Sequence, residues 1–164
     1  AAEPNSCPKL TRGKCQYDFG DQSCYTPLLP MFTLGPQFKP SNIHAGGLRY
    51  HGAGMIVSQL IKDKMMHGVD IPQLESFESG MLFARTEGII PAPESCHAIA
   101  ATIREAKKCK ETGEQKVILF CLSGHGLIDM PSYEQFISGD LQNYTVSDEE
   151  IERNVSELEP IIKE

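Results

Sequence analysis

Side chains that could do chemistry gather first in a short stretch at 122–126, which reads Leu-Ser-Gly-His-Gly. Ser123 offers a hydroxyl and His125 an imidazole, directly after the apolar run Val-Ile-Leu-Phe-Cys-Leu. Such a run is typical of a strand that is buried on both faces of a helix-covered parallel sheet. Ligands of open α/β sheets bind outside the carboxyl ends of the strands, so this turn is placed to meet a small molecule. The alternative is a tight turn that needs its glycines for backbone reasons alone.

Two further stretches carry reactive side chains, one at 44–52 (His-Ala-Gly-Gly-Leu-Arg-Tyr-His-Gly) and one at 85–98 (Arg-Thr-Glu-Gly-Ile-Ile-Pro-Ala-Pro-Glu-Ser-Cys-His-Ala). A nucleophilic hydrolase would combine Ser123 with His97 and Glu87 as a triad. The sequence Cys-Leu-Ser-Gly-His does not match the G-x-S-x-G elbow that such a serine requires. The triad is therefore the less favoured interpretation.

Neither the histidines nor the cysteines show the spacing of a metal site. Zinc would need three loops to converge, with the ligands His44, His51, His97 and His125. The six cysteines include no C-x-x-C pair, and Cys121 falls inside the predicted buried strand. We interpret them as free thiols, which are typical of a reducing compartment. The first residues, Ala-Ala-Glu-Pro, lack a signal-peptide pattern, so the sequence indicates the cytoplasm.

The composition narrows the classes of partner. A chain of 164 residues can bury a substantial core, and one domain is the default at this length. The hydrophobic content of 40% and the charged content of 23% are ordinary for a globular protein, and no stretch approaches the length of a membrane span. The net charge of −7, without a basic stripe, argues against a nucleic-acid partner. We expect a small ligand or another protein.

The chain divides by pattern into three parts that together form one incomplete domain. Residues 1–52 are rich in Pro and Gly and lack periodicity, which predicts an irregular connecting region. Because long loops without their own structure are unusual, this region is either a functional loop or packs against a part of the protein outside this sequence. Residues 53–146 carry the pattern of an α/β core segment, and residues 147–164 that of a C-terminal helix and tail.

Apolar spacing predicts where the regular elements lie. Helices are expected over 56–65, 77–87 and 93–112, with glycines at 68, 88 and 113 to end them, and a short strand over 69–74. A short helix is expected after Asp129 or Ser132, and Ser147 with Glu150 predicts a capping box before the last helix. These strands are too few for the length. The fold class is therefore α/β, part of a doubly wound, mainly parallel sheet with helices on both faces.

These motifs together resemble a known family. The stretch at 85–98, followed about two dozen residues later by Leu-Ser-Gly-x-Gly, is similar to the tryptophan synthase beta chain. The segments Gly-Leu-Arg-Tyr-His-Gly at 47–52 and Tyr-Asp-Phe-Gly-Asp at 17–21 resemble the divergent second type of that family, the beta-like branch. The resemblance spans essentially the whole chain.

The resemblance implies a pyridoxal 5'-phosphate enzyme of fold type II that joins L-serine and indole into L-tryptophan by β-replacement. In this family the serine of Leu-Ser-Gly, here Ser123 followed by Gly124, hydrogen-bonds the pyridine nitrogen of the cofactor. A hydroxyl does not hold that nitrogen protonated as a carboxylate would, which suits elimination and addition at Cβ. The family glutamate, here Glu87, lines the pocket beside the ring. Its alternative role is a local pair with Arg85.

Two family motifs do not occur in this sequence. The Schiff-base lysine follows a His in the family, and the cofactor phosphate is held by a Gly-Gly-Gly-Ser-Asn loop; both are absent here. The chain therefore looks like the C-terminal portion of a longer enzyme, predicted to be inactive alone. The implied partners are the missing N-terminal half, a second copy in a homodimer and the tryptophan synthase alpha chain. The rival interpretation is a non-catalytic ligand-binding or protein-interaction module.

The segment at 47–50 carries two further expectations. Arg49 stands where ordinary beta chains have an aspartate that meets the serine hydroxyl, and a guanidinium pairs well with an anion. The donor would then be O-phosphoserine or another β-anionic amino acid, unless Arg49 is purely structural. The family also binds a monovalent cation, K⁺ or Na⁺, through backbone carbonyls, for which Gly47, Leu48 and Tyr50 are the candidates.

Overall fold

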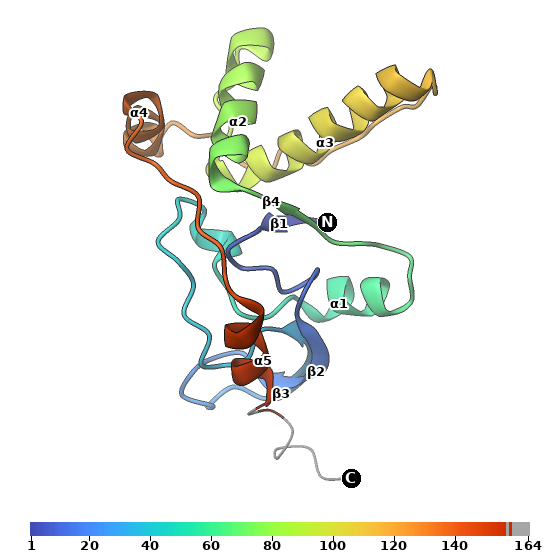
Figure 1. Ribbon diagram of the computed structural model, residues 1–164, viewed down its shortest axis with the longest axis vertical. Coiled ribbons are helices and arrows are strands. Elements are labelled where there is room, and N and C mark those ends of the chain that lie inside the picture. The colour runs from blue at the N-terminus through green and yellow to red at the C-terminus, as the bar shows by residue number, and fades with distance from the viewer. Residues whose placement is uncertain (157, 159–164) are drawn as a thin grey trace.

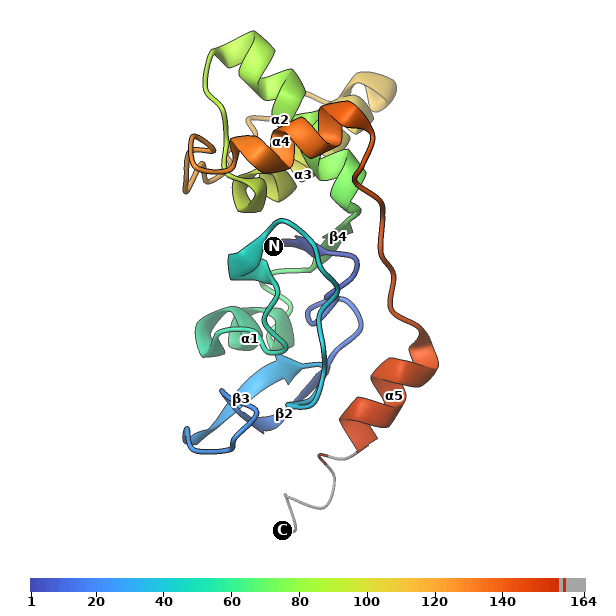
Figure 2. The ribbon, with the colours of Figure 1, turned by 90° about the vertical axis from the view of Figure 1, so that its left-hand side faces the viewer.

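The computed structural model describes residues 1–156 and 158, which form an elongated molecule in three tiers (Figures 1 and 2). Helices α2, α3 and α4 gather at one end, a short parallel strand pair lies in the middle, and a hairpin with helices α1 and α5 forms the other end. The described elements are β1 (Ala2–Pro4), β2 (Lys14–Phe19), β3 (Leu28–Thr33), the 3-10 helix η1 (Gly46–Leu48), α1 (Met55–Lys62), β4 (Val69–Ile71), α2 (Gln73–Glu87), α3 (Pro93–Thr112), α4 (Met130–Ser138) and α5 (Asp148–Ser156).

The fold class is α/β, as the sequence predicts. Strands β1 and β4 pair in parallel, with Glu3 opposite Asp70, and α3 packs against both strands. Parallel strands are normally covered by helices, because their connections cross over a face of the sheet. In the described part of the chain each sheet has two strands, so the parallel sheet is a small part of an α/β domain.

Residues 1–52 are more regular than the sequence predicts. They contain β1 and an antiparallel hairpin in which Lys14 pairs with Thr33 and Phe19 with Leu28. Pro30 and the charged residues of β2 hide the alternation that would predict this hairpin, and cross-strand pairing supplies what the local pattern lacks. The division of the chain into three parts remains a prediction.

Most of the helices begin and end where the sequence predicts. Gly88 and Gly113 follow α2 and α3 in the left-handed region, each with φ of 73°. The Ser147 hydroxyl accepts a hydrogen bond from the Glu150 amide at 3.1 Å, so the capping interaction before α5 is present. Helix α1 ends at Lys62 rather than near Gly68, and Lys64 takes a φ of 58°.

The prediction of a buried strand at 116–122 is wrong for this chain. The segment is in no described sheet, and the side chains of Val117 and Leu119 are 101% and 94% exposed. The other side of the segment packs on α2, where the rings of Phe120 and Phe83 meet edge to face at 5.7 Å. A strand buried on both faces needs neighbouring strands and helices on both sides, whereas the described residues supply no neighbouring strand here and a helix on one side only.

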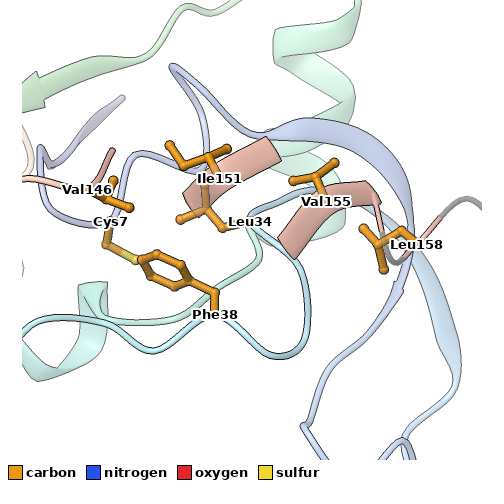
Figure 3. Close-up of a cluster of buried hydrophobic side chains, with 7 residues drawn as sticks. All are labelled: Cys7, Leu34, Phe38, Val146, Ile151, Val155 and Leu158. Carbon is orange, nitrogen blue, oxygen red and sulfur yellow. The ribbon is translucent and has the colours of Figure 1, made fainter. Parts of the chain in front are cut away.

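The C-terminal segment is held to the N-terminal third by a buried apolar cluster. Figure 3 shows its members, which come from residues far apart in the chain: Cys7, Leu34, Phe38, Val146, Ile151, Val155 and Leu158. Arg12 reinforces the contact, because its guanidinium donates to the Val146 carbonyl at 2.9 Å and pairs with Asp148. Helix α5 is therefore part of the hairpin end of the molecule.

The structure adds two chemical facts about the chain as a whole. All six cysteines are free thiols, as the sequence predicts, although Cys121 is exposed rather than buried. In the described residues no helix has both the length and the apolar character that crossing a membrane would take.

Candidate functional site

The Ser-Gly-His-Gly turn lies against the extended segment that leads into α3. The Ala92 amide donates to the Gly124 carbonyl at 2.9 Å, and the Gly126 amide donates to the Ile90 carbonyl at 2.7 Å. A Cβ on Gly126 would lie 2.4 Å from the Pro91 carbonyl oxygen, so this close approach requires glycine. The two stretches that the sequence singled out, 85–98 and 122–126, are thus brought together in space.

Ser95 holds the turn in place from the first turn of α3. Its hydroxyl is buried, accepts a hydrogen bond from the Gly124 amide at 3.1 Å and lies 3.2 Å from the Ser123 hydroxyl. Ser123 itself is exposed. The arrangement therefore presents one neutral hydroxyl to solvent and fixes it through a second, buried hydroxyl.

Helix α4 and helix α3 hold the segment at 90–92 by contacts to the Pro91 carbonyl. The Tyr133 hydroxyl of α4 donates to the Pro91 carbonyl at 2.5 Å and lies 3.3 Å from the Cys96 sulfur. Burial raises the pKa of the Cys96 thiol to about 11, and burial also raises the pKa of Tyr133, so both groups stay protonated at neutral pH. Their role is to hold Pro91, and through it the turn at 123–126.

Glu87 is the last residue of α2 and is exposed. In the described part of the chain its carboxylate makes no hydrogen bond or ion pair, and none of the described hydrogen bonds links it to Ser123 or to Arg85. A carboxylate at a helix carboxyl end is opposed by the helix dipole. The pocket role of Glu87 remains a prediction, and the local pair with Arg85 is not formed.

His97 does not join Ser123 in a triad. Its ring is buried in α3, where Nδ1 lies 2.8 Å from the Pro93 carbonyl and 3.2 Å from the Ser76 hydroxyl. Burial lowers the pKa of His97, because the charged imidazolium is poorly solvated there. His97 is therefore a neutral core residue that joins α2 to α3.

The buried His97 makes a testable contribution to acid sensitivity. Since its pKa is lower folded than unfolded, the unfolded chain binds more protons, and stability falls as pH drops below about 6.5. The slope for one proton is at most about 1.4 kcal/mol per pH unit. Urea unfolding at pH 7.0 and 5.5 should show that wild type loses more stability than His97→Gln. The variant keeps all other titrating groups, so an equal loss in both chains would contradict this assignment.

The loop at 44–52 is fixed from two sides. The Glu94 carboxylate of α3 accepts a hydrogen bond from the Gly47 amide at 3.0 Å. On the other side the Lys9 ammonium donates to the Leu48 carbonyl at 2.9 Å, and the Cys7 thiol donates to the Tyr50 carbonyl at 3.2 Å. The Leu48 and Tyr50 carbonyls thus each accept one hydrogen bond from this chain, and the cation site at 47–50 remains a prediction.

Arg49 lies between these two anchored carbonyls. Its Nε is buried and has no hydrogen-bond partner among the described residues. A buried guanidinium nitrogen without an acceptor is costly, and an anion would satisfy it. The position therefore supports the expectation that Arg49 faces an anionic group.

The histidines are not arranged for zinc. The ring nitrogens of His44 lie 3.0 Å from the Gln135 amide oxygen and 3.0 Å from the Ser132 hydroxyl. The His51 Nε2 donates to the Phe19 carbonyl at 2.9 Å. In the part of the chain that the structure describes, no three His, Cys, Asp or Glu side chains gather as metal ligands. The sequence does not favour zinc either.

Three residues that sequence reasoning does not select shape the site: Ser95, Glu94 and Lys9. Ser95 and Glu94 lie inside the stretch at 85–98 that the sequence analysis selects, so their motif could have identified them. No sequence motif marks Lys9, which lies 39 residues before its partner Leu48. Only the folded chain brings the two together.

Comparison with known proteins gives the same family as the sequence motifs. No protein-family model matches the chain. The chain is 57% identical over 141 residues to tryptophan synthase beta chain 2 of Aquifex aeolicus, which covers 86% of this chain and 32% of the relative. It is 52% identical over 141 residues to the protein of that name from Methanothermobacter thermautotrophicus (86% of this chain, 33% of the relative) and 56% identical over 133 residues to that from Thermotoga maritima (81% and 32%).

These similarities cover most of this chain but only about a third of each relative. The identities are far above those at which the shared fold is in question, and they fall on the second type of beta chain, as the motifs predict. The matched part of this chain therefore belongs to the tryptophan synthase beta chain family and corresponds to about a third of one of its members.

Proposed function

We propose that this chain is the C-terminal portion of a pyridoxal-phosphate-dependent tryptophan synthase of the second beta-chain type. The complete enzyme would join L-serine, or O-phosphoserine, with indole to form L-tryptophan. The observation that carries the proposal is the exposed Ser123 hydroxyl, fixed by the buried Ser95 at the turn that the family motif marks. The high identity to beta chains supports it.

The residues present fit one side of the cofactor. A neutral hydroxyl such as Ser123 can hydrogen-bond a pyridine nitrogen without forcing a positive charge onto the ring. Gly124 keeps the backbone close, since a Cβ there would lie 3.2 Å from the Ala92 Cβ. When bound, the cofactor supplies the electron sink for elimination and addition at Cβ. This chain's part is to orient the ring and to hold it as a weak electron sink.

The remaining machinery would come from residues outside this sequence. The family's lysine and phosphate loop have no counterpart here. The isolated chain is therefore expected to hold no covalently bound cofactor and to make no tryptophan. The partner that completes it would be the N-terminal portion of the enzyme, with a homodimer and an alpha chain as further proposed partners.

A chimera tests the proposal. The matching third of Aquifex aeolicus tryptophan synthase beta chain 2 is replaced by this chain, and tryptophan is measured after addition of indole, L-serine and pyridoxal phosphate. The chimera should be active, whereas Ser123→Ala should lower its kcat at least about tenfold, because the ring loses its hydrogen bond. A folded chimera without activity, beside an active parent, would refute the enzyme proposal and favour a binding module.

The donor is tested in the same chimera. Arg49→Asp removes the cation that would pair with a β-phosphate, so we expect the ratio of kcat/KM for O-phosphoserine over serine to fall about tenfold or more. Arg49→Lys is the control, because it keeps the charge but loses the bidentate fork, and should fall less. An unchanged ratio in Arg49→Asp would show that Arg49 is structural.

A further inference from the structure

Lys9 is a buried lysine whose ammonium is held by a backbone carbonyl. Its side chain is 8% exposed, and Nζ donates to the Leu48 carbonyl at 2.9 Å. The other described partner of Nζ is the Cys7 sulfur at 4.0 Å. Lysines are almost never this buried unless their charge is paired or hydrogen-bonded.

No carboxylate pairs directly with this ammonium among the described residues. Glu3 is close enough for its charge to be felt, but its oxygens accept hydrogen bonds from the Leu10 amide, the Thr11 amide and the Thr11 hydroxyl, at 2.7–2.8 Å. Burial raises the pKa of the Cys7 thiol, so the sulfur stays protonated and donates to the Tyr50 carbonyl. The described contacts of the ammonium are thus one carbonyl oxygen and one neutral thiol, with the Glu3 carboxylate further away.

We propose that the Lys9 ammonium takes the place of the free monovalent cation beneath the loop at 44–52. An ammonium has the charge of K⁺ and a similar size, and carbonyl oxygen is a ligand that both accept. A second cation on the Leu48 carbonyl would lie beside Nζ in a partly buried site, where like charges repel more than they do in open water. The chain therefore supplies its own cation, tethered through the Lys9 side chain.

The tether fixes the backbone on one side of Arg49, because Leu48 precedes it directly. The stability of the wild-type chain should consequently not depend on which monovalent cation the buffer contains. The location of the family's cation rests on the proposed function, but the stability of the isolated chain in different salts does not depend on catalysis. The melting temperatures can therefore contradict the role of Lys9 even if the chimera makes tryptophan. They can equally support that role if the chimera is inactive.

The test compares melting temperatures at constant ionic strength in KCl, NaCl and choline chloride. Wild type should melt within about 1 °C in all three salts. Lys9→Ala opens the space and should melt lower in choline, and KCl or NaCl should raise its melting temperature by about 3–8 °C. Lys9→Met fills the space without a charge, so it should show no such rise.

Two results would overturn the proposal. One is a wild-type chain that KCl or NaCl stabilises over choline, since a free cation would then bind beside Lys9. The other is that neither Lys9→Ala nor the neutral, shorter Lys9→Gln gains from KCl or NaCl. If Lys9→Ala is unfolded in choline, folding on addition of KCl counts as the gain, and a failure to fold in every salt leaves Lys9→Gln to decide.

Discussion

Asp18→Ala is expected to destabilise the chain by about 2–5 kcal/mol, because it removes a buried carboxylate that accepts two hydrogen bonds. The Asp18 side chain is fully buried, and its carboxylate accepts from the Phe19 amide at 2.7 Å and from the Thr33 hydroxyl. His51 Nε2 lies 3.6 Å from the same carboxylate. Removing the acceptor leaves the Phe19 amide and the Thr33 hydroxyl without their partner, and it removes the carboxylate that lies beside His51. Urea unfolding measures the loss.

Asp21→Ala is the matched control for this substitution. Asp21 lies three residues further along and accepts from the Tyr25 amide at 3.0 Å and the Thr26 amide at 3.1 Å, but both bonds are exposed. Because water replaces a lost acceptor at the surface, this variant should lose only about 0.5–1.5 kcal/mol. Similar losses for Asp18→Ala and Asp21→Ala would mean that the buried network carries no special share of the stability.

Glu87→Gln is expected to move stability and activity in opposite directions. In the isolated chain it should raise the free energy of unfolding by about 0.3–1 kcal/mol, because a negative charge leaves the carboxyl end of α2. In the chimera it should lower kcat by about 10²–10⁴-fold, if the carboxylate moves protons in the pocket. Urea unfolding and tryptophan formation check the two halves of the expectation.

Glu111→Gln separates the helix effect from the pocket effect. Glu111 is exposed in the last turn of α3, so removing its charge should stabilise the isolated chain in the same way. It has no place in the proposed pocket, so the chimera's kcat should stay unchanged. If Glu87→Gln leaves kcat as unaffected as Glu111→Gln does, Glu87 has no catalytic role.

The proposed function, in which a separate N-terminal portion completes the site, would explain why some segments near the site are anchored and others are exposed. The turn at 123–126 is fixed by Ser95 and by backbone bonds to 90–92, so it is ready without further partners. The segment before it, in contrast, exposes Val117 and Leu119 and forms no ladder. Backbone and apolar side chains of that kind are satisfied when neighbouring strands are added. In the proposed pocket this chain would supply the anchored turn at 123–126, and the proposed N-terminal portion would cover the segment before it.

Local chemistry in the sequence determined the helices and the family. Gly88 and Gly113 end helices because a left-handed residue is cheapest without a Cβ, and the Ser147 cap acts within one turn. The motifs at 85–98 and 122–126 sufficed for the family because they consist of contiguous residues, and the similarity to known beta chains agrees. The sequence marks Gly126 as a turn glycine, but the close approach to Pro91 that requires it is visible only in the fold.

Tertiary structure decided whatever depended on distant partners. The run at 116–122 has the composition of a buried strand, yet burial depends on neighbouring elements, and among the described residues Val117 and Leu119 have none that cover them. The hairpin at 14–33 needed cross-strand pairing to appear. The contact between Lys9 and Leu48 joins residues that share no motif, so no local sequence pattern could predict it. The sequence by itself thus determined which groups are present and which family they belong to, and the fold decided which groups meet, because meeting depends on long-range packing.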